Sequence, residues 1–228
     1  MRTGVEPAGR ARHKAGMIRT RAPVPFPAAA DAIVAAGRWL DTRGWAPGGG
    51  GNYSHRLDDG TLAITASGTH KGRITTADVM RITPDGTPLD PARPSDETLL
   101  HCQIYRLFPQ ANAVLHSHGT ASLILARARP EALAIRLAGW ELLKAFPGIT
   151  THDTAVALPV VDNDQDMVRL SARIEPQLLA QPAPPAYVIR DHGVYGWGRS
   201  MDEAARVVET VEYLLGLELG LIQVGANR

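Results

Sequence analysis

The sequence has few of the features that place a protein outside the cytoplasm. Its 228 residues include one cysteine, Cys102, so no disulfide can form within the chain. We therefore expect a reducing, cytoplasmic environment. No run of about 18 apolar residues is present, which argues against a transmembrane helix. The segment 1–21 is rich in arginine but lacks an apolar centre, so it does not resemble a secretory signal.

An excess of charge of one sign is also missing. The chain has 24 Lys and Arg residues against 23 Asp and Glu residues, a formal net charge of +1. No overall field therefore favours nucleic acid or an anionic membrane as a partner. Aromatic residues make up only 5% of the chain, without the clustering on a basic surface that nucleic-acid binders show. A module that contacts RNA through residues 1–21 remains an alternative, which salt-sensitive RNA binding lost on their deletion would support.

Apolar residues, at 44%, are sufficient for one sizeable core. No internal repeat of about 20–50 residues is visible, which excludes solenoids and propellers. We predict a basic, disordered extension over residues 1–24 and a single catalytic domain over residues 25–228. An incorrectly assigned start, with Met17 as the true first residue, is an alternative for the extension.

The spacing of apolar residues predicts a mixture of helices and strands. Helices are expected over 27–43, 96–108, 120–128, 164–175 and 201–224, and strands over 52–57, 61–65, 79–83, 113–115, 155–161 and 186–190. Asp58-Asp59-Gly60 joins the first two strands as a hairpin, and Ser95 or Asp96 is a suitable cap for the second helix. The sum is an α/β or α+β fold with a mixed sheet and helices on its faces.

Three histidines follow predicted strands. His116 and His118 come directly after residues 113–115, and side chains two apart along a strand point the same way, so both rings face one space. His192 follows the strand at 186–190. Three histidines leave an open position on a tetrahedral zinc ion, as a catalytic site needs. The same residues also fit solvated histidines at a polar strand end and in a loop. We interpret the other five histidines as ordinary surface or core residues.

Two glycine-rich segments indicate anion binding. Gly48–Gly51 leads into Asn52, and Ser67-Gly68 leads towards Lys71. Exposed backbone N–H groups with hydroxyl, amide and ammonium donors suit a phosphate monoester. Two ordinary loops would have the same composition. Neither segment matches a Walker A or dinucleotide fingerprint, which disfavours a nucleotide.

Two carboxylates are candidates for proton transfer. Glu97 opens the predicted helix directly after Pro94-Ser95-Asp96. Glu141 lies among apolar neighbours in Gly139–Lys144, where burial would raise its pKa into a useful range. A surface role for either glutamate is the alternative, and the residues alone do not decide between the two.

The ordered motifs together resemble the class II aldolase family. They are Gly51-Asn52-Tyr53-Ser54, Ser67-Gly68, Pro94-Ser95-Asp96-Glu97, His116-Ser117-His118 and Asp191-His192-Gly193. The resemblance covers roughly residues 28 to 222. It implies a central, mainly antiparallel sheet of nine strands with helices on both faces. It also implies a homotetramer whose active site lies near a subunit boundary, with a sugar phosphate as substrate.

The resemblance also implies roles for individual residues. It assigns one zinc ion per subunit to His116, His118 and His192, and gives Glu97 the place of the catalytic glutamate of the aldolases. It assigns substrate phosphate to Asn52, Ser67, Gly68 and Ser95, with Lys71 nearby. One departure is Gly50, where the family usually has Thr or Ser; this removes a hydroxyl contact but leaves the backbone donors.

Four further stretches are most similar to the dehydratase branch of the family, which removes water from 5-methylthioribulose 1-phosphate in methionine salvage. They are Ser67–Gly72, Glu141–Lys144, Asp162–Asp166 and His192–Gly198. This likeness implies a lyase with Glu141 as its acid/base. An aldolase or 4-epimerase on another sugar phosphate, of the fuculose or ribulose type, is the alternative.

Overall fold

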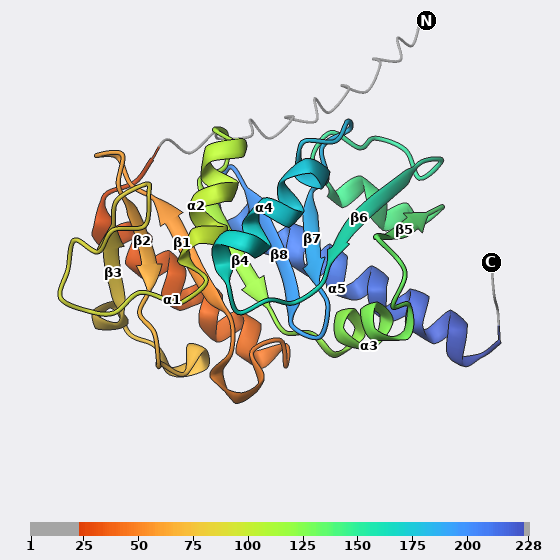
Figure 1. The fold of residues 1–228 in the computed structure, drawn as a ribbon, viewed down its shortest axis with the longest axis horizontal. Coiled ribbons are helices and arrows are strands. Elements are labelled where there is room, and N and C mark those ends of the chain that lie inside the picture. The colour runs from red at the N-terminus through yellow and green to blue at the C-terminus, as the bar shows by residue number, and fades with distance from the viewer. Residues whose placement is uncertain (1–22, 226–228) are drawn as a thin grey trace, which may run out of the picture.

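The computed structural model of this protein describes residues 23–225. Its strands form one eight-stranded sheet in the order β3-β2-β1-β4-β8-β7-β6-β5 (Figure 1). Their bounds are β1 Asn52–Arg56, β2 Leu62–Thr65, β3 Val79–Ile82, β4 Ala113–Ser117, β5 Ala134–Ala138, β6 Ala155–Val161, β7 Ala186–Ile189 and β8 Gly193–Gly198. Neighbouring strands are antiparallel except β6 and β7, which are parallel. The predicted mixed, mainly antiparallel sheet is confirmed, but within residues 23–225 it has eight strands rather than nine.

Within residues 23–225, five α-helices cover this sheet. They are α1 Phe26–Thr42, α2 Thr98–Leu107, α3 Thr120–Ala128, α4 Met167–Leu178 and α5 Met201–Gln223. Short 3₁₀ helices are η1 Pro47–Gly49, η2 Lys71–Arg73, η3 Thr76–Asp78 and η4 Glu141–Ala145. Within residues 23–225, no helix combines the length and apolar character needed to cross a membrane.

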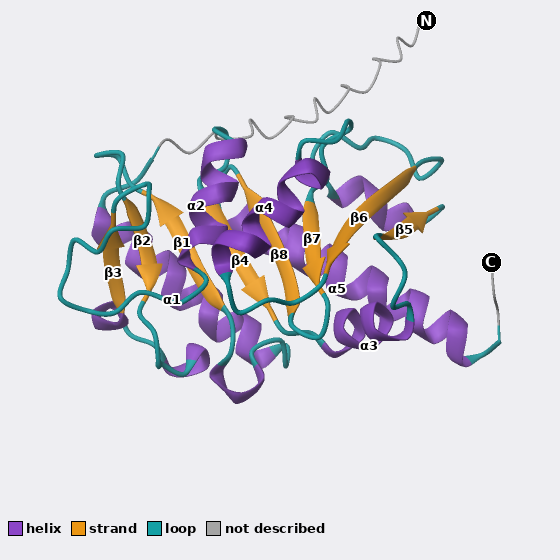
Figure 2. Cartoon of the chain, viewed as in Figure 1, coloured by secondary structure: helices purple, strands orange, loops and turns teal. Residues whose placement is uncertain are grey.

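Helices lie on both faces of the sheet, as the sequence predicts (Figure 2). In the view of Figure 1, α2 and α4 lie in front of the sheet, while α1 and α5 lie behind it. Strand residues alternate between the two faces, because successive side chains of a strand point in opposite directions. In β4, Val114 packs with the helices α2 and α4, and Leu115 packs on the side of α1 and α5.

Two helices begin later than predicted. The second helix begins at Thr98, with Glu97 as its N-cap residue, because Ser95 accepts hydrogen bonds from Thr98 and Glu97 in a preceding turn. The helix predicted over 164–175 begins at Met167, because the Asp166 carboxylate accepts hydrogen bonds from the first free N–H groups.

Strands β5 and β8 are absent from the predicted set. The sequence of β8, Gly-Val-Tyr-Gly-Trp-Gly, has the composition of a loop. In the structure its glycines allow α5 to lie directly on the strand: a Cβ atom at Gly196 would be 2.8 Å from the Val208 side chain, and one at Gly198 would be 2.6 Å from the Ala204 nitrogen. Close packing of a helix, not a turn, accounts for these glycines.

The segment 1–22 of the predicted extension lies outside the described residues. Val24, which we assigned to the end of that extension, pairs with Leu57 in an isolated bridge. The folded part therefore includes residues 23 and 24, just before the predicted start at residue 25.

Candidate metal centre and adjoining cavity

The three predicted metal ligands lie together at one end of the central strands. His116 is in β4, His118 directly follows that strand, and His192 ends the turn between β7 and β8. One nitrogen atom of each ring lies within 4.8 Å of the others. The Nε2 atom of His116 is 2.9 Å from that of His118 and 3.4 Å from that of His192. The predicted gathering of these three rings is thus present in the structure.

Hydrogen bonding and burial prepare this group for a cation. His116 Nδ1 lies 3.0 Å from the Val194 carbonyl oxygen, so in the neutral ring Nδ1 carries the proton and Nε2 is free to act as a ligand. Burial lowers the pKa of His116 well below its usual value, and burial together with His192 lowers that of His118 to about 4. Three imidazoles with converging nitrogens fit a divalent metal ion and leave one position of a tetrahedral ion open.

We call the cluster of His116, His118 and His192 the metal group. Glu97 adds a carboxylate to this cluster. One of its oxygens lies 3.0 Å from His192 Nε2, and the other lies 3.3 Å from His116 Nε2 and accepts a hydrogen bond from the Tyr195 hydroxyl. Burial acts to raise the pKa of Glu97, but His116, His192 and Asn52 outweigh it, so the pKa lies well below its usual range. Tyr195 stays protonated, because burial and this carboxylate raise its pKa. An ionised carboxylate therefore faces the space between the histidines.

A cavity of about 400 Å³ opens beside His118 and Glu97. Its lining includes all five residues assigned to phosphate: Asn52, Ser67, Gly68, Lys71 and Ser95. Lys71 is nearly buried, and burial lowers the pKa of its ammonium group, which donates to the Thr69 carbonyl oxygen over 2.6 Å. The two glycine-rich segments therefore form one polar cavity next to the metal group.

Two glycines allow the first of these segments to approach the histidines. A Cβ atom at Gly50 would be 2.6 Å from His118 Nδ1, and one at Gly51, whose φ is +90°, would be 2.5 Å from the His116 carbonyl oxygen. The backbone N–H of His118 also donates a hydrogen bond to the Trp45 carbonyl oxygen over 2.8 Å. The glycine at position 50 thus stands where a side chain would press on a histidine ring.

Glu141 is not part of this assembly. It begins η4, its side chain is 68% exposed, it forms an ion pair with Lys144, and one of its carboxylate oxygens lies 3.5 Å from His152 Nδ1. The hydrogen bond from Lys144 lowers its pKa. The expectation that apolar neighbours bury Glu141 and raise its pKa is therefore wrong for the single chain: Leu143 is buried, and Glu141 points to the surface.

Three further residues of this region are absent from the predicted site. His101 is completely buried and lies beside Asn52, although we interpreted it as an ordinary histidine. Tyr195 stacks on His116, with ring centroids 4.2 Å apart. Glu212 of α5 is buried beneath the strand end.

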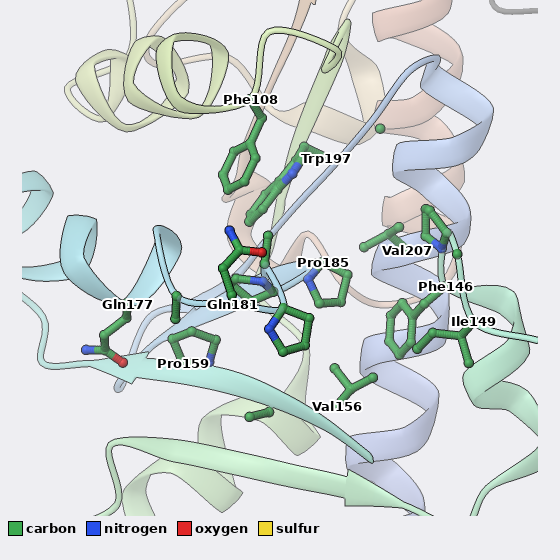
Figure 3. A pocket seen from close by; sticks show the side chains of 18 of the residues that line it. Phe108, Phe146, Ile149, Val156, Pro159, Gln177, Gln181, Pro185, Trp197 and Val207 are labelled. Carbon is green, nitrogen blue, oxygen red and sulfur yellow. The ribbon is translucent and has the colours of Figure 1, made fainter. Parts of the chain in front are cut away.

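A second, larger cavity, of about 1160 Å³, lies at the opposite ends of β4 and β8. Figure 3 shows its mainly apolar lining, with Phe108 and Trp197 stacked at one side and Pro159 and Val156 along β6. None of the predicted site residues lines it. Of these two cavities, the smaller one is therefore the one that predicted site residues line.

The sequence and the fold were compared with known proteins. Residues 31–219 match the family model of the class II aldolase and adducin N-terminal domain. The chain belongs to this family. It is 51% identical over 192 residues to a methylthioribulose-1-phosphate dehydratase of Gluconobacter oxydans, covering 84% of this chain and 91% of that protein. It is 48% identical to the protein of the same name from Methylococcus capsulatus, covering 85% and 94%.

Solved structures share the fold of this family member. An L-fuculose 1-phosphate aldolase has a TM-score of 0.72 with 20% identity, covering 87% of this chain and 88% of that one. The L-fuculose-1-phosphate aldolase of Thermus thermophilus has a TM-score of 0.70 with 22% identity, covering 89% and 100%. The class II aldolase-like fold predicted from the sequence is confirmed.

Proposed function

We propose that this protein is a hydro-lyase of methionine salvage. It removes water from 5-methylthioribulose 1-phosphate and gives 5-methylthio-2,3-dioxopentyl phosphate. The observation that carries this proposal is the 51% identity to a methylthioribulose-1-phosphate dehydratase over 91% of that relative. The group of three histidines beside a polar cavity supplies the chemistry that the reaction needs.

We propose zinc as the metal, one ion per subunit, held by His116, His118 and His192. Three imidazoles with one open position are typical of catalytic zinc, although other divalent ions share these ligands. When bound, the ion supplies positive charge that stabilises the negative oxygen formed as a carbon acid next to a carbonyl group loses its proton.

The residues of this chain bind and orient the substrate. Asn52, Ser67, Gly68 and Ser95 would hold its phosphate group, with Lys71 contributing charge. This places the ketone end of the sugar towards His118 and Glu97, which line the same cavity. We assign the acid/base step to Glu141, which would take the C3 proton and return a proton to the departing C4 hydroxyl as water forms. The enol that remains would then ketonise, losing the proton of its C3 hydroxyl and gaining one at C4, which gives the 2,3-diketone.

We further propose a homotetramer whose active sites lie near subunit boundaries. The exposed position of Glu141, outside the cavity of its own chain, supports this arrangement because a neighbouring subunit could present it. The oligomer would act on a small molecule in the cytoplasm, without nucleic acid or membrane as a partner.

A second candidate function is cleavage or epimerisation of another sugar phosphate. The specific observation in its favour is that Glu97, which the family resemblance implies is the counterpart of the aldolases' catalytic glutamate, lies against His192 and His116. Aldol cleavage breaks the C3–C4 bond, whereas dehydration begins with loss of the C3 proton. Both leave negative charge on the oxygens at C2 and C3, so the same group of histidines would serve either reaction.

Turnover of two substrates tests the proposal. Purified protein with zinc should consume methylthioribulose 1-phosphate and leave fuculose 1-phosphate unchanged, with the diketone phosphate followed by absorbance and mass. It should hold about one zinc per chain, and His116→Ala should lose most of the metal together with activity. Cleavage of fuculose 1-phosphate without dehydration would establish the second candidate. Full zinc in His116→Ala would contradict the ligand assignment.

A further inference from the structure

A chain of buried hydrogen bonds runs behind the polar cavity, from the core of the protein to the assigned phosphate residues. The Tyr105 hydroxyl lies 2.9 Å from Ser54 Oγ, which lies 2.7 Å from His101 Nδ1. The other ring nitrogen of His101 bonds to Asn52 Oδ1. Tyr105, Ser54, His101 and Asn52 are all at least nine-tenths buried, so each polar atom must find its partner within the protein.

The direction of these bonds starts from the charge state of His101. Burial lowers the pKa of its ring to about 4, so the ring is neutral at physiological pH. A neutral imidazole has one donor and one acceptor nitrogen. Either Nε2 donates to Asn52 and Nδ1 accepts from Ser54, or the reverse holds and Asn52 must turn its amide over.

The surroundings of Asn52 choose between these two arrangements. Its Nδ2 atom faces two oxygen atoms, at 3.2 Å from Ser95 Oγ and 3.0 Å from Glu97 Oε2. Turning the amide over would place Oδ1 against the carboxylate oxygen of Glu97, two acceptors with no proton between them. The Nδ2 atom therefore faces the cavity side, Oδ1 faces His101, and His101 Nε2 is the donor.

We propose that His101 is a positioning residue that fixes the amide of Asn52, so that Asn52 presents its N–H groups to the phosphate half of the site. Ser54 and Tyr105 hold His101 in the required tautomer, because the Tyr105 hydroxyl donates to Ser54 and the Ser54 hydroxyl donates to Nδ1. This inference rests on the proposed function, in which Asn52 binds phosphate. His101 does not touch the substrate; it acts through Asn52.

The test compares two replacements of His101. Phenylalanine keeps a ring of similar size without a donor, while glutamine can place an N–H close to the position of Nε2. Inorganic phosphate is the probe, as a ligand in calorimetry and as an inhibitor of turnover. We expect His101→Phe to weaken phosphate binding about tenfold, and Asn52→Ala to weaken it as well. His101→Gln should restore most of the affinity. KM should rise by a similar factor, with a smaller change in kcat and unchanged zinc content.

A variant elsewhere on α2 controls for general destabilisation. Gln103 is buried and donates to the Ser171 carbonyl oxygen over 2.7 Å and to Glu175, on the side of α4 and outside the cavity. Gln103→Met should lower thermal stability while leaving phosphate affinity and KM near wild type. If His101→Phe lowers stability in the same way with no change in phosphate affinity, the positioning role is overturned.

Two further measurements keep the outcome unambiguous. If His101→Phe does not fold, Ser54→Ala removes the donor that fixes the tautomer and should weaken phosphate binding several-fold; unchanged affinity in that variant overturns the proposal. If the wild-type protein binds phosphate but does not dehydrate methylthioribulose 1-phosphate, the proposed reaction fails. Weaker phosphate binding in His101→Phe would then still support the positioning role, so the two failures are distinguishable.

Discussion

The histidines of this protein show how the surroundings of a residue determine its role. His116 is completely buried, with one nitrogen committed to the Val194 carbonyl oxygen and the other facing His118 and His192. His152, by contrast, is mainly exposed and its ring faces Glu141. Of the two, His116 is the one whose second nitrogen points into a space shared with other histidines, which is what a metal ligand requires.

Glu141 and Glu97 allow a direct comparison of two carboxylates. Glu141→Gln keeps size and hydrogen bonding but removes the ability to transfer a proton. Under the proposed function its kcat on methylthioribulose 1-phosphate should fall by about 10²–10⁴, the usual contribution of general acid–base catalysis. Zinc content should remain near wild type, because Glu141 lies outside the histidine group. Steady-state kinetics and elemental analysis of the purified variant measure both quantities.

Glu97→Gln is the matched variant. Its carboxylate contacts His192 and His116, so its charge acts at the metal group rather than at the surface. We expect a smaller loss of kcat in dehydration than for Glu141→Gln. If Glu97→Gln is nearly inactive and Glu141→Gln is near wild type, the acid/base assignment fails and the aldolase-like alternative replaces it.

The residues of the candidate site could be predicted from sequence to different degrees. The histidines could be found because each lies at the end of a strand or directly after one, and Asn52 and Ser67 because each adjoins a glycine-rich segment. The exposure of Glu141 could not be predicted, because apolar neighbours in sequence do not determine which side of a short 3₁₀ helix faces the core. The role of His101 could not be predicted, because its partners Asn52 and Ser54 come from a strand 49 and 47 residues away, respectively.

At the scale of elements, α5 supports the strand end that carries the histidines. Ser117 lies between His116 and His118 and points to the opposite face, where its hydroxyl donates to Glu212 of α5 over 2.7 Å. The same carboxylate oxygen accepts from the Gly119 N–H over 3.3 Å, at the N-cap of α3. A Cβ atom at Gly119 would be 2.0 Å from the other carboxylate oxygen. Glu212 therefore joins β4, α3 and α5 at one point.

Burial makes this junction sensitive to pH. It raises the pKa of Glu212 to about 7 from an ordinary 4.5, although Ser117 and Gly119 oppose the shift. Because the folded pKa is the higher one, the folded state holds the proton more tightly than the unfolded state. The stability associated with this proton is present below about pH 4.5 and is lost as the pH rises through about 7.

Glu212→Gln should remove this dependence, because glutamine resembles the protonated acid at every pH. Relative to wild type, the free energy of unfolding of the variant should increase by about 2–3 kcal/mol between pH 5 and pH 8. Urea unfolding of both proteins measures this difference. A chelator in the buffer prevents metal binding by the histidines from contributing to the measured stability. Glu209→Gln, on an exposed side of α5, controls for loss of a charge. Parallel pH profiles for wild type and Glu212→Gln would contradict the prediction.

The elements themselves were predictable where one pattern dominated. The long α5 and the hairpin of β1 and β2 follow from apolar spacing and a turn of Asp58-Asp59-Gly60. Strand β8 could not be predicted, because its glycines serve the approach of α5, which is a tertiary contact. Strand β5 lies at the edge of the sheet, and its exposed and buried residues alternate over only five positions. This alternating pattern is too short to predict a strand.

At the scale of the whole molecule, the proposed acid/base residue and the metal group occupy separate parts of the chain. Glu141 follows the edge strand β5, while His116 lies in β4, and the three strands β6, β7 and β8 lie between them in the sheet. Glu141 is exposed, whereas His116 is buried. A head-to-tail ring of identical subunits brings different surfaces of neighbouring chains together, and so could place Glu141 of one subunit at the metal group of the next.

Co-expression of two inactive variants tests this arrangement. A subunit with His116→Ala lacks a metal ligand but keeps Glu141, and a subunit with Glu141→Gln keeps the metal group. If each site takes its metal group and its acid/base from neighbouring subunits, random mixing in a ring should restore roughly a quarter of wild-type activity. Two separately tagged chains, purified through both tags, provide the mixed oligomer, and each single variant is the control. Activity no higher than that of the controls would mean that Glu141 serves its own chain or no site at all, because every subunit of the mixture then carries one defect.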